Sequence, residues 1–162
     1  MNPPFFPLTL EQMRSKKFFH TLNCGARFTV AGASVSTALL NHPQKVCGYR
    51  IEEDGKSIVY ASDTEPAGGK HPKTLTRFAK GADLLLFDAQ YTPQEYIEGK
   101  IGWGHSTYSD ATLLAKTAEV KKLVLFHHEP AHNDTFLSKL EQNARRDFPD
   151  TVSAREGMTI EL

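Results

Sequence analysis

Cysteine is scarce in this chain. Only Cys24 and Cys47 occur among 162 residues, and they form no C-x-x-C pair. Nothing in this spacing indicates a disulfide framework of the kind that small secreted domains use. We therefore expect reduced thiols in a cytoplasmic protein. The first residues, MNPPFFPLTLEQ, lack a basic segment followed by a long apolar stretch, so no signal peptide is expected either.

An excess of either charge is also lacking. Lysine and arginine together number 19, as do aspartate and glutamate, so the composition predicts no general affinity for nucleic acid, and only local patches remain open. No aliphatic run approaches the ~20 residues that span a bilayer, so no membrane contact is expected. The 40% apolar and 23% charged residues are typical of one globular domain with a sizeable core.

Short β-branched and aromatic runs fill the first third of the chain. Breaks that contain glycine, asparagine or aspartate separate them, which is the pattern of strands joined by turns. Asp54 and Gly55 lie between two such runs and predict a hairpin. The predicted strands are residues 16–22, 27–30, 34–40, 46–52 and 57–62.

Helices and strands alternate after Asp63. Apolar residues recur at i, i+3, i+4 and i+7 from Ala111 to Ala118, which predicts an amphipathic helix. Thr107 and Asp110 have the spacing of a capping box, and Asp134 is the predicted N-cap of the last helix. Helices are expected over 71–81, 108–120 and 133–148, and strands over 82–90 and 122–126, with one or two more within 151–162. This order predicts an α/β fold in one domain, residues 1–162, with a mixed sheet and helices on at least one face.

Four predicted strands end in an aspartate or a histidine. His42, Asp63, Asp88 and His127 each follow an apolar run. Function gathers beyond the carboxyl ends of strands in open α/β sheets, and imidazole and carboxylate are ordinary ligands of zinc, manganese and iron. The pattern therefore suggests a convergent metal site.

Other interpretations of these residues remain open. Asp63 fits a turn cap, and Asp88, followed by Ala-Gln, fits a turn or a carboxylate that orients a ligand better than a ligand itself. His128 and His132 fit a solvated loop. A local site made of His127, His128, His132 and Asp134 is disfavoured, because adjacent residues at an extended strand end do not both face one ion.

The remaining histidines divide into two kinds. His20 in a predicted strand and His71 before a proline are expected to be structural. His105 lies in GWGHST, between glycines and a helix start. That position suits a mobile general acid or an anion contact, and a local hydrogen bond fits it equally well.

Several segments in order resemble one family. LNHP, CGYRIE, SIVYASDTEP, ADLLLFDAQYTPQEY, GWGHSTYSDA and KKLVLFHHEPAHND together resemble the C-terminal half of metallo-β-lactamase-fold hydrolases, in the bacterial branch related to ribonuclease Z and cyclic-nucleotide phosphodiesterases. The resemblance covers essentially the whole chain. It implies half of an α-β/β-α sandwich and a phosphodiesterase-type, metal-dependent activity.

The resemblance also implies roles for four residues. His42 matches a ligand of the first metal, Asp63 the aspartate that bridges two metals, and His127 a ligand of the second metal. His105 matches the histidine that protonates the leaving group. Such a site holds two divalent ions, zinc or manganese, which activate a bridging water and stabilise the phosphoryl oxygens.

This sequence departs from the family in one large respect. The H-x-H-x-D-H signature is absent, and no H-x-H occurs anywhere in the chain. Met1 therefore resembles an internal methionine, and the chain is expected to supply about three ligands of an incomplete site. Two hypotheses follow. The chain is the C-terminal half of a hydrolase of small-molecule or nucleotide phosphodiesters, inactive alone, or it is a non-catalytic remnant that acts by self-association or partner binding.

The missing half has a further consequence for assembly. A single sheet with helices on one side leaves its other face without the second sheet of the sandwich. A contiguous apolar face of that size exceeds what monomers usually expose. We therefore expect the chain to form a homo-oligomer, to bind the missing half, or to rearrange its β-segments.

Overall fold

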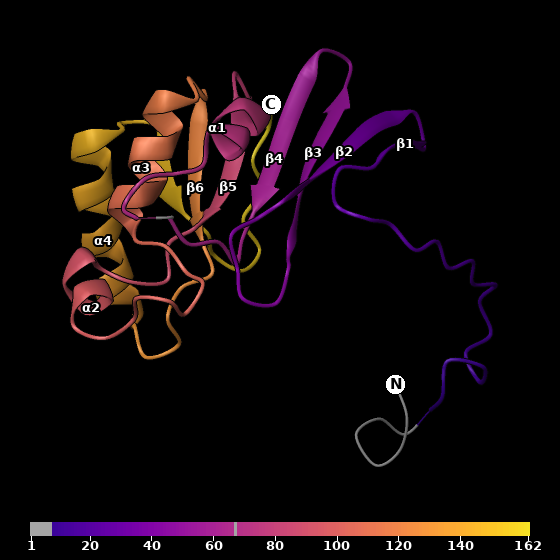
Figure 1. The fold of residues 1–162 in the computed structure, drawn as a ribbon, viewed down its shortest axis with the longest axis horizontal. Coiled ribbons are helices and arrows are strands. Elements are labelled where there is room, and N and C mark those ends of the chain that lie inside the picture. The colour runs from indigo at the N-terminus through magenta and orange to yellow at the C-terminus, as the bar shows by residue number, and fades with distance from the viewer. Residues whose placement is uncertain (1–7, 67) are drawn as a thin grey trace.

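The computed structural model describes residues 8–66 and 68–162. Its sheet has seven strands in the order β1-β2-β3-β4-β5-β6-β7, so each strand lies beside its neighbour in sequence (Figure 1). The strands are β1 Arg27–Val30, β2 Ala33–Leu39, β3 Cys47–Glu53, β4 Lys56–Ala61, β5 Leu84–Asp88, β6 Lys122–Phe126 and β7 Thr151–Ser153. The helices are α1 Lys73–Ala79, α2 Pro93–Ile97, α3 Tyr108–Thr117 and α4 Asp134–Asp147.

The sheet is mixed, which confirms the predicted α/β class. Strands β1 to β4 pair antiparallel, and β4 to β7 pair parallel. The predicted hairpin joins β3 to β4. Asp54 and Gly55 have φ angles of 48° and 75°, the left-handed pair that a two-residue turn of type I′ requires.

Three helices cover one face of the sheet. Every second residue of β4, β5 and β6 points to this face. One cross-strand row on it consists of Val59, Leu85 and Leu123, which belong to one core cluster. Buried residues of α1, α3 and α4 complete that cluster, namely Leu75, Ala79, Ala111, Leu114, Ala115, Leu140 and Ala144. The helix predicted from the Ala111–Ala118 spacing therefore packs as expected, and Thr107 with Asp110 forms the predicted capping box.

The alternate residues of the strands form the opposite side, which we call the open face. Cross-strand partners lie on the same side of a sheet, and the register aligns two apolar rows there. Tyr49 and Ile51 on this face are 39% and 38% exposed, whereas Val35, Leu84 and Val124 are buried, so only part of the face is open to solvent. The open face comprises Val35, Tyr49, Ile51, Ile58, Tyr60, Leu84, Leu86, Val124 and Val152. None of the helices in the described residues is long and apolar enough to cross a membrane.

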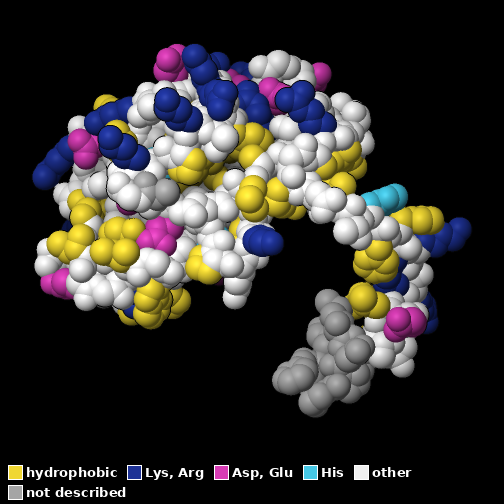
Figure 2. All heavy atoms as spheres, in the orientation of Figure 1, with side chains coloured by type: hydrophobic (Ala, Val, Ile, Leu, Met, Phe, Trp, Pro, Cys, Tyr) yellow, Lys and Arg dark blue, Asp and Glu magenta, His cyan; other side chains and the backbone are white. Residues whose placement is uncertain are grey.

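The strand predicted over residues 16–22 does not form. This segment belongs to an extended arm, residues 8–22, that leads away from the sheet (Figures 1 and 2). Phe18 and Phe19 are 81% and 78% exposed, and His20 is exposed with them, not held in a strand. A β-branched and aromatic run becomes a strand only when a partner accepts its hydrogen bonds, and no described segment pairs with it.

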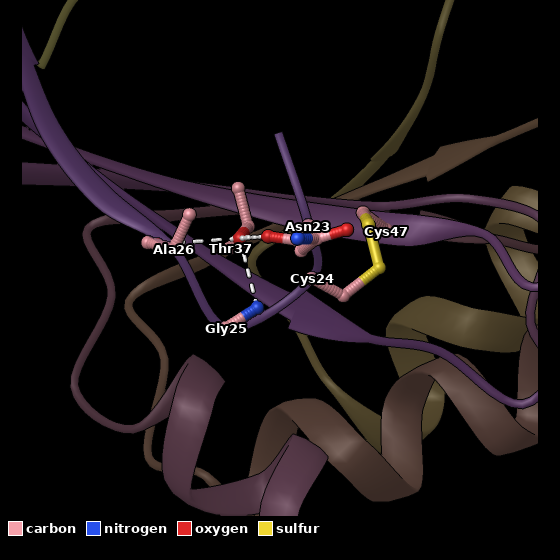
Figure 3. Close-up of a disulfide and its surroundings, with 6 residues drawn as sticks. All are labelled: Asn23, Cys24, Gly25, Ala26, Thr37 and Cys47. Atoms are coloured by element: carbon pink, nitrogen blue, oxygen red, sulfur yellow. Dashed lines mark hydrogen bonds between the residues drawn. A yellow bond between two sulfur atoms is a disulfide. The ribbon is translucent and has the colours of Figure 1, made fainter. Parts of the chain in front are cut away.

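Two further predictions were wrong. Asn133, not Asp134, is the N-cap of α4, because its side chain accepts a hydrogen bond from the backbone N–H of Phe136. The cysteines are not free thiols. Cys24 and Cys47 form a disulfide with a Cα–Cα distance of 5.5 Å (Figure 3).

The disulfide joins the turn before β1 to the first residue of β3. Thr37 of β2 supports that turn, since its Oγ1 accepts from the backbone N–H of Gly25 at 3.0 Å. The strand pairing carries the turn back to the start of β3, although 23 positions separate the two cysteines in sequence. Spacing excludes a C-x-x-C motif but says nothing of a pair that a sheet brings together.

A half-exposed ion pair at the opposite end of the strands, between the exposed Lys121 and the buried Asp83, gives a test of acid stability. Asp83 accepts from Lys121 Nζ at 2.7 Å and from the backbone N–H of Ser57 at 2.8 Å. These bonds, that with Lys121 above all, lower the pKa of Asp83 from 3.8 to about 2. A lowered folded-state pKa stabilises the fold above the unfolded-state pKa, and this contribution is lost as pH falls toward the folded-state pKa.

Asp83→Asn is therefore expected to lower the melting temperature near pH 7, with the difference from the parent protein shrinking toward about pH 2. Asp147→Asn is the matched control, because Asp147 is an exposed carboxylate that meets only Lys116 at 3.4 Å. Thermal unfolding followed by circular dichroism measures both. A difference that stays constant with pH would contradict the assigned ionisation.

Candidate metal centre

Four polar side chains meet at the carboxyl ends of β4, β5 and β6. Asp63, Asp88, His105 and His127 each offer a ligand atom, and these atoms all lie within 4.8 Å of one another. Parallel strands end at one edge of a sheet, which is why residues 25 and more positions apart converge. Among the residues that the structure describes, no other group of histidine, cysteine and carboxylate side chains is arranged in this way.

Asp88 is fully buried, and its carboxylate contacts the two neighbouring segments that carry Asp63 and His105. Its Oδ2 accepts from the backbone N–H of Asp63 at 3.0 Å and lies 2.9 Å from His105 Nδ1. Its Oδ1 accepts from the backbone N–H groups of Gln90 and Ser106 at 3.2 and 3.1 Å. Both oxygens are thus engaged by the protein. This agrees with the interpretation of Asp88 as an orienting carboxylate.

His105 is held in a defined tautomer by this carboxylate. An ionised Asp88 only accepts, so Nδ1–H of His105 donates to it and Nε2 remains the nitrogen that can exchange a proton. The hydrogen bond to Asp88 raises the pKa of His105, against the opposing effect of burial. Its ring stacks on that of His127, with 4.8 Å between centroids. His105 is therefore both oriented and biased toward carrying a proton.

Asp63 and His127 are the accessible members of the group. Their side chains are 35% and 36% exposed, and Asp63 Oδ1 lies 3.3 Å from His127 Nε2. Both residues have a φ of 57°, in the left-handed region that residues with a Cβ seldom adopt. Such strain concentrates at functional sites. One carboxylate oxygen and one imidazole nitrogen that face each other are suitable donors for a divalent transition metal.

His42 lies beside the group but outside it. It belongs to the loop between β2 and β3, and its ring centroid is 5.5 Å from that of His105. Its Nδ1 accepts from the backbone N–H of Gln44 at 3.2 Å. Gly104, with a φ of 95°, packs directly against this ring, where any side chain would collide with it. The structure thus brings His42 to the rim of the site, and its role as a ligand stays a prediction.

Glu65 is a site residue that sequence reasoning missed. Only 7% of it is exposed. Its Oε1 accepts from Tyr96 Oη at 2.5 Å and from the backbone N–H of Gly102 at 2.7 Å, and its Oε2 accepts from that of Gly104 at 2.9 Å. This carboxylate fixes the loop that precedes His105. Its position two residues after Asp63 was the one indication that the sequence offered.

The histidines after His127 do not extend the cluster. His132 is not a solvated loop residue as predicted, because its side chain is only 7% exposed and its Nε2 lies 2.8 Å from Glu95 Oε1. Burial lowers the pKa of His128. The disfavoured local site of His127, His128, His132 and Asp134 is not formed among the described residues. His71, as expected, is structural, with Nε2 2.9 Å from the carbonyl oxygen of Asp110.

Comparison with known proteins agrees with this geometry. The beta-lactamase superfamily domain matches residues 6–128, which is more than half of the chain. The chain therefore belongs to the beta-lactamase superfamily. Ribonuclease Z of Metallosphaera sedula is 38% identical over 101 residues, which are 62% of this chain and 31% of that protein. The chain thus spans about a third of the length of the curated relatives that it matches.

Solved structures share the fold. The metallo-beta-lactamase fold protein YhfI from Bacillus subtilis superposes with a TM-score of 0.70 at 19% identity, covering 86% of this chain and 54% of that one. Zn(2+)-bound PqqB from Methylobacterium extorquens gives a TM-score of 0.65 at 21% identity, covering 88% and 52%. These likenesses confirm the metallo-β-lactamase-type fold that the sequence predicted.

Proposed function

We propose that this chain is the C-terminal half of a metal-dependent, phosphodiesterase-type hydrolase. The observation that carries the proposal is the Asp88–His105 pair set against the accessible donors Asp63 and His127. His105 Nδ1 lies 3.9 Å from Asp63 Oδ1, so the imidazole adjoins the proposed ligands, where a general acid can assist metal-dependent hydrolysis of a phosphodiester. The relatives named ribonuclease Z support a phosphodiester of nucleotides as the substrate class.

Each residue has a distinct part in the proposed reaction. Asp63 and His127 would hold a divalent ion, zinc or manganese, with His42 joining from the rim. The bound metal would supply an activated water and stabilise charge on the phosphoryl oxygens. His105 would give its Nε2 proton to the leaving oxygen, and Asp88 holds its ring in the required tautomer.

The proposed site is incomplete within this chain. About three ligands do not close a dinuclear site, so the remaining ligands would come from a segment that carries H-x-H-x-D-H. Residues 1–162 would then be one half of a catalytic domain, without turnover of their own.

Cytoplasmic placement belongs to the same proposal. In that reducing compartment Cys24 and Cys47 would be thiols, so the disulfide is the observation that weighs against it.

Metal content tests the half-site directly. Ligands that do not close a first shell bind divalent ions weakly and must be deprotonated to do so. Dialysed protein is expected to retain well under one tightly bound metal per chain. Titration calorimetry is expected to detect weak zinc binding to the parent protein and none to Asp63→Ala. Asp147→Ala is the control, since this exposed carboxylate lies on α4. Two metals retained per chain in elemental analysis would overturn the half-site.

A non-catalytic role is the second candidate. The open face and the arm favour it, because Tyr49 and Ile51 on the face and the two phenylalanines of the arm present apolar surface to solvent. Under this hypothesis the protein acts by self-association or by binding a partner, and the metal centre is a remnant without catalytic function. Phosphodiester turnover after an H-x-H-x-D-H segment is supplied would exclude it.

A further inference from the structure

The loop between α2 and α3 presents large apolar side chains to solvent. Ile101 and Trp103 are 64% and 56% exposed, and Ile97 at the end of α2 is 65% exposed. The same loop is not loose, because Glu65 holds the backbone N–H groups of Gly102 and Gly104. Exposed apolar side chains on a fixed backbone are suited to contact with a ligand, since little conformational freedom remains to be lost on binding.

Trp103 borders the metal centre. It precedes His105 by two residues, so their Cα atoms lie within about 7 Å of each other. The intervening Gly104 packs against the ring of His42. Trp103 therefore lies on the loop that carries His105, beside the four-residue metal cluster and not part of it.

Lys100 gives this surface a charge. Its Nζ lies 3.9 Å from the centroid of the Trp103 ring and 5.4 Å from that of Tyr91. Among the ion pairs of the described residues Lys100 takes no part, so its ammonium is available to an anion. The lysine occupies one side of the indole, and more than half of Trp103 is still open to solvent.

We propose that Trp103 and Lys100 form a nucleotide-binding platform, on which the base next to the cleaved phosphodiester stacks on the indole while a phosphate meets the lysine. The inference rests on the proposed function and deepens it, naming single-stranded nucleic acid as the substrate class. A base has a planar face for Trp103 and a phosphate for Lys100, which is the combination that single-strand binders use. A paired base could not present its face, so duplex is a poor ligand for this surface.

The single tryptophan of the chain makes the platform directly observable. Trp103 is the only tryptophan, so stacking of a base on it is seen as quenching of indole fluorescence. The intact chain is titrated with a short single-stranded oligoribonucleotide, with a chelator present so that neither metal nor cleavage contributes. Saturable quenching is expected. An abasic ribose-phosphate oligomer of equal length is expected to quench little, because it carries the charge without the bases.

Substitutions separate stacking from charge. Trp103→Leu is expected to weaken binding of a labelled oligonucleotide about tenfold by anisotropy, and Trp103→Phe to retain most of it. Lys100→Met is expected to reduce the slope of log affinity against log salt by about 1. Leu113→Ser, at a 49% exposed site on α3, is the matched control and should bind normally.

Other outcomes would overturn the platform. Equal quenching by the abasic oligomer, or unchanged affinity of Trp103→Leu, would mean that stacking does not occur. Indole fluorescence that ignores oligonucleotide but responds to a protein segment carrying H-x-H-x-D-H would make this surface a protein contact. Stacking without any phosphodiester turnover in the complemented protein would leave the platform standing and remove the proposed hydrolase, so the two failures are distinguishable.

Discussion

His105→Ala is expected to lower phosphodiester turnover by about 10²–10⁴-fold, in an assay where an H-x-H-x-D-H segment completes the site. The structure gives the reason. His105 is hydrogen-bonded to Asp88 through Nδ1 and has Nε2 free to exchange a proton, so under the proposed function it would donate a proton without holding the ion. Metal content of the variant should therefore equal that of the parent protein. Steady-state kinetics and elemental analysis of the same samples measure both quantities.

Asp63→Ala provides the contrast to that variant. Asp63 Oδ1 faces His127 Nε2 at 3.3 Å, so its loss should remove metal and turnover together. Asp147→Ala on the surface of α4 should change neither. Unchanged turnover in His105→Ala would remove this histidine from the mechanism, and loss of metal in it would make it a ligand instead.

Self-association is the second large effect that we expect. The isolated chain should sediment as a dimer at micromolar concentration, because pairing of two open faces removes apolar surface from water at about 25 cal/mol per Å². A stable interface needs roughly 800 Å² from each partner, so the exposed phenylalanines of the arm are expected to join the sheet face in the contact. A two-fold axis is the simplest arrangement, since one patch then meets its own copy.

Charge placed on the open face should reverse the association. Ile51→Lys introduces an ammonium at an exposed position of β3, and is expected to shift the equilibrium to monomer without unfolding the chain. Leu113→Lys on α3, at a site that is 49% exposed against 38% for Ile51, should leave the dimer intact. Sedimentation equilibrium measures the molecular mass of both variants in solution. A folded monomer of the parent chain that binds no apolar dye would show that its surface is already closed.

Local chemistry made much of the fold predictable. Asp54-Gly55, the Thr107–Asp110 capping box and the alternation in β4 to β6 act over a few residues, so the sequence carries them. The convergence of Asp63 and His127 also followed from their places at the ends of strands, because parallel strands share an edge.

Long-range partners explain what could not be predicted. Residues 16–22 have strand composition, but no strand within residues 8–66 and 68–162 pairs with them. The pairing of Cys24 with Cys47 depends on how the turn at Gly25 folds back onto β2. Glu65 acquires its function from backbone N–H groups 37 and 39 positions later. In each case the deciding contact lies outside any local window of sequence.

The sequential strand order has a consequence for how the chain reaches its fold. Because β1 to β7 are arranged as they occur in the chain, each new strand can add to the edge left by the one before it. The β1–β4 meander needs only short turns and can form within microseconds of its synthesis. The parallel strands β5 to β7 wait for their crossover segments, which makes their docking the slower stage. During translation the sheet can therefore grow from β1 toward β7, and the four side chains of the metal centre come together only when β6 has docked.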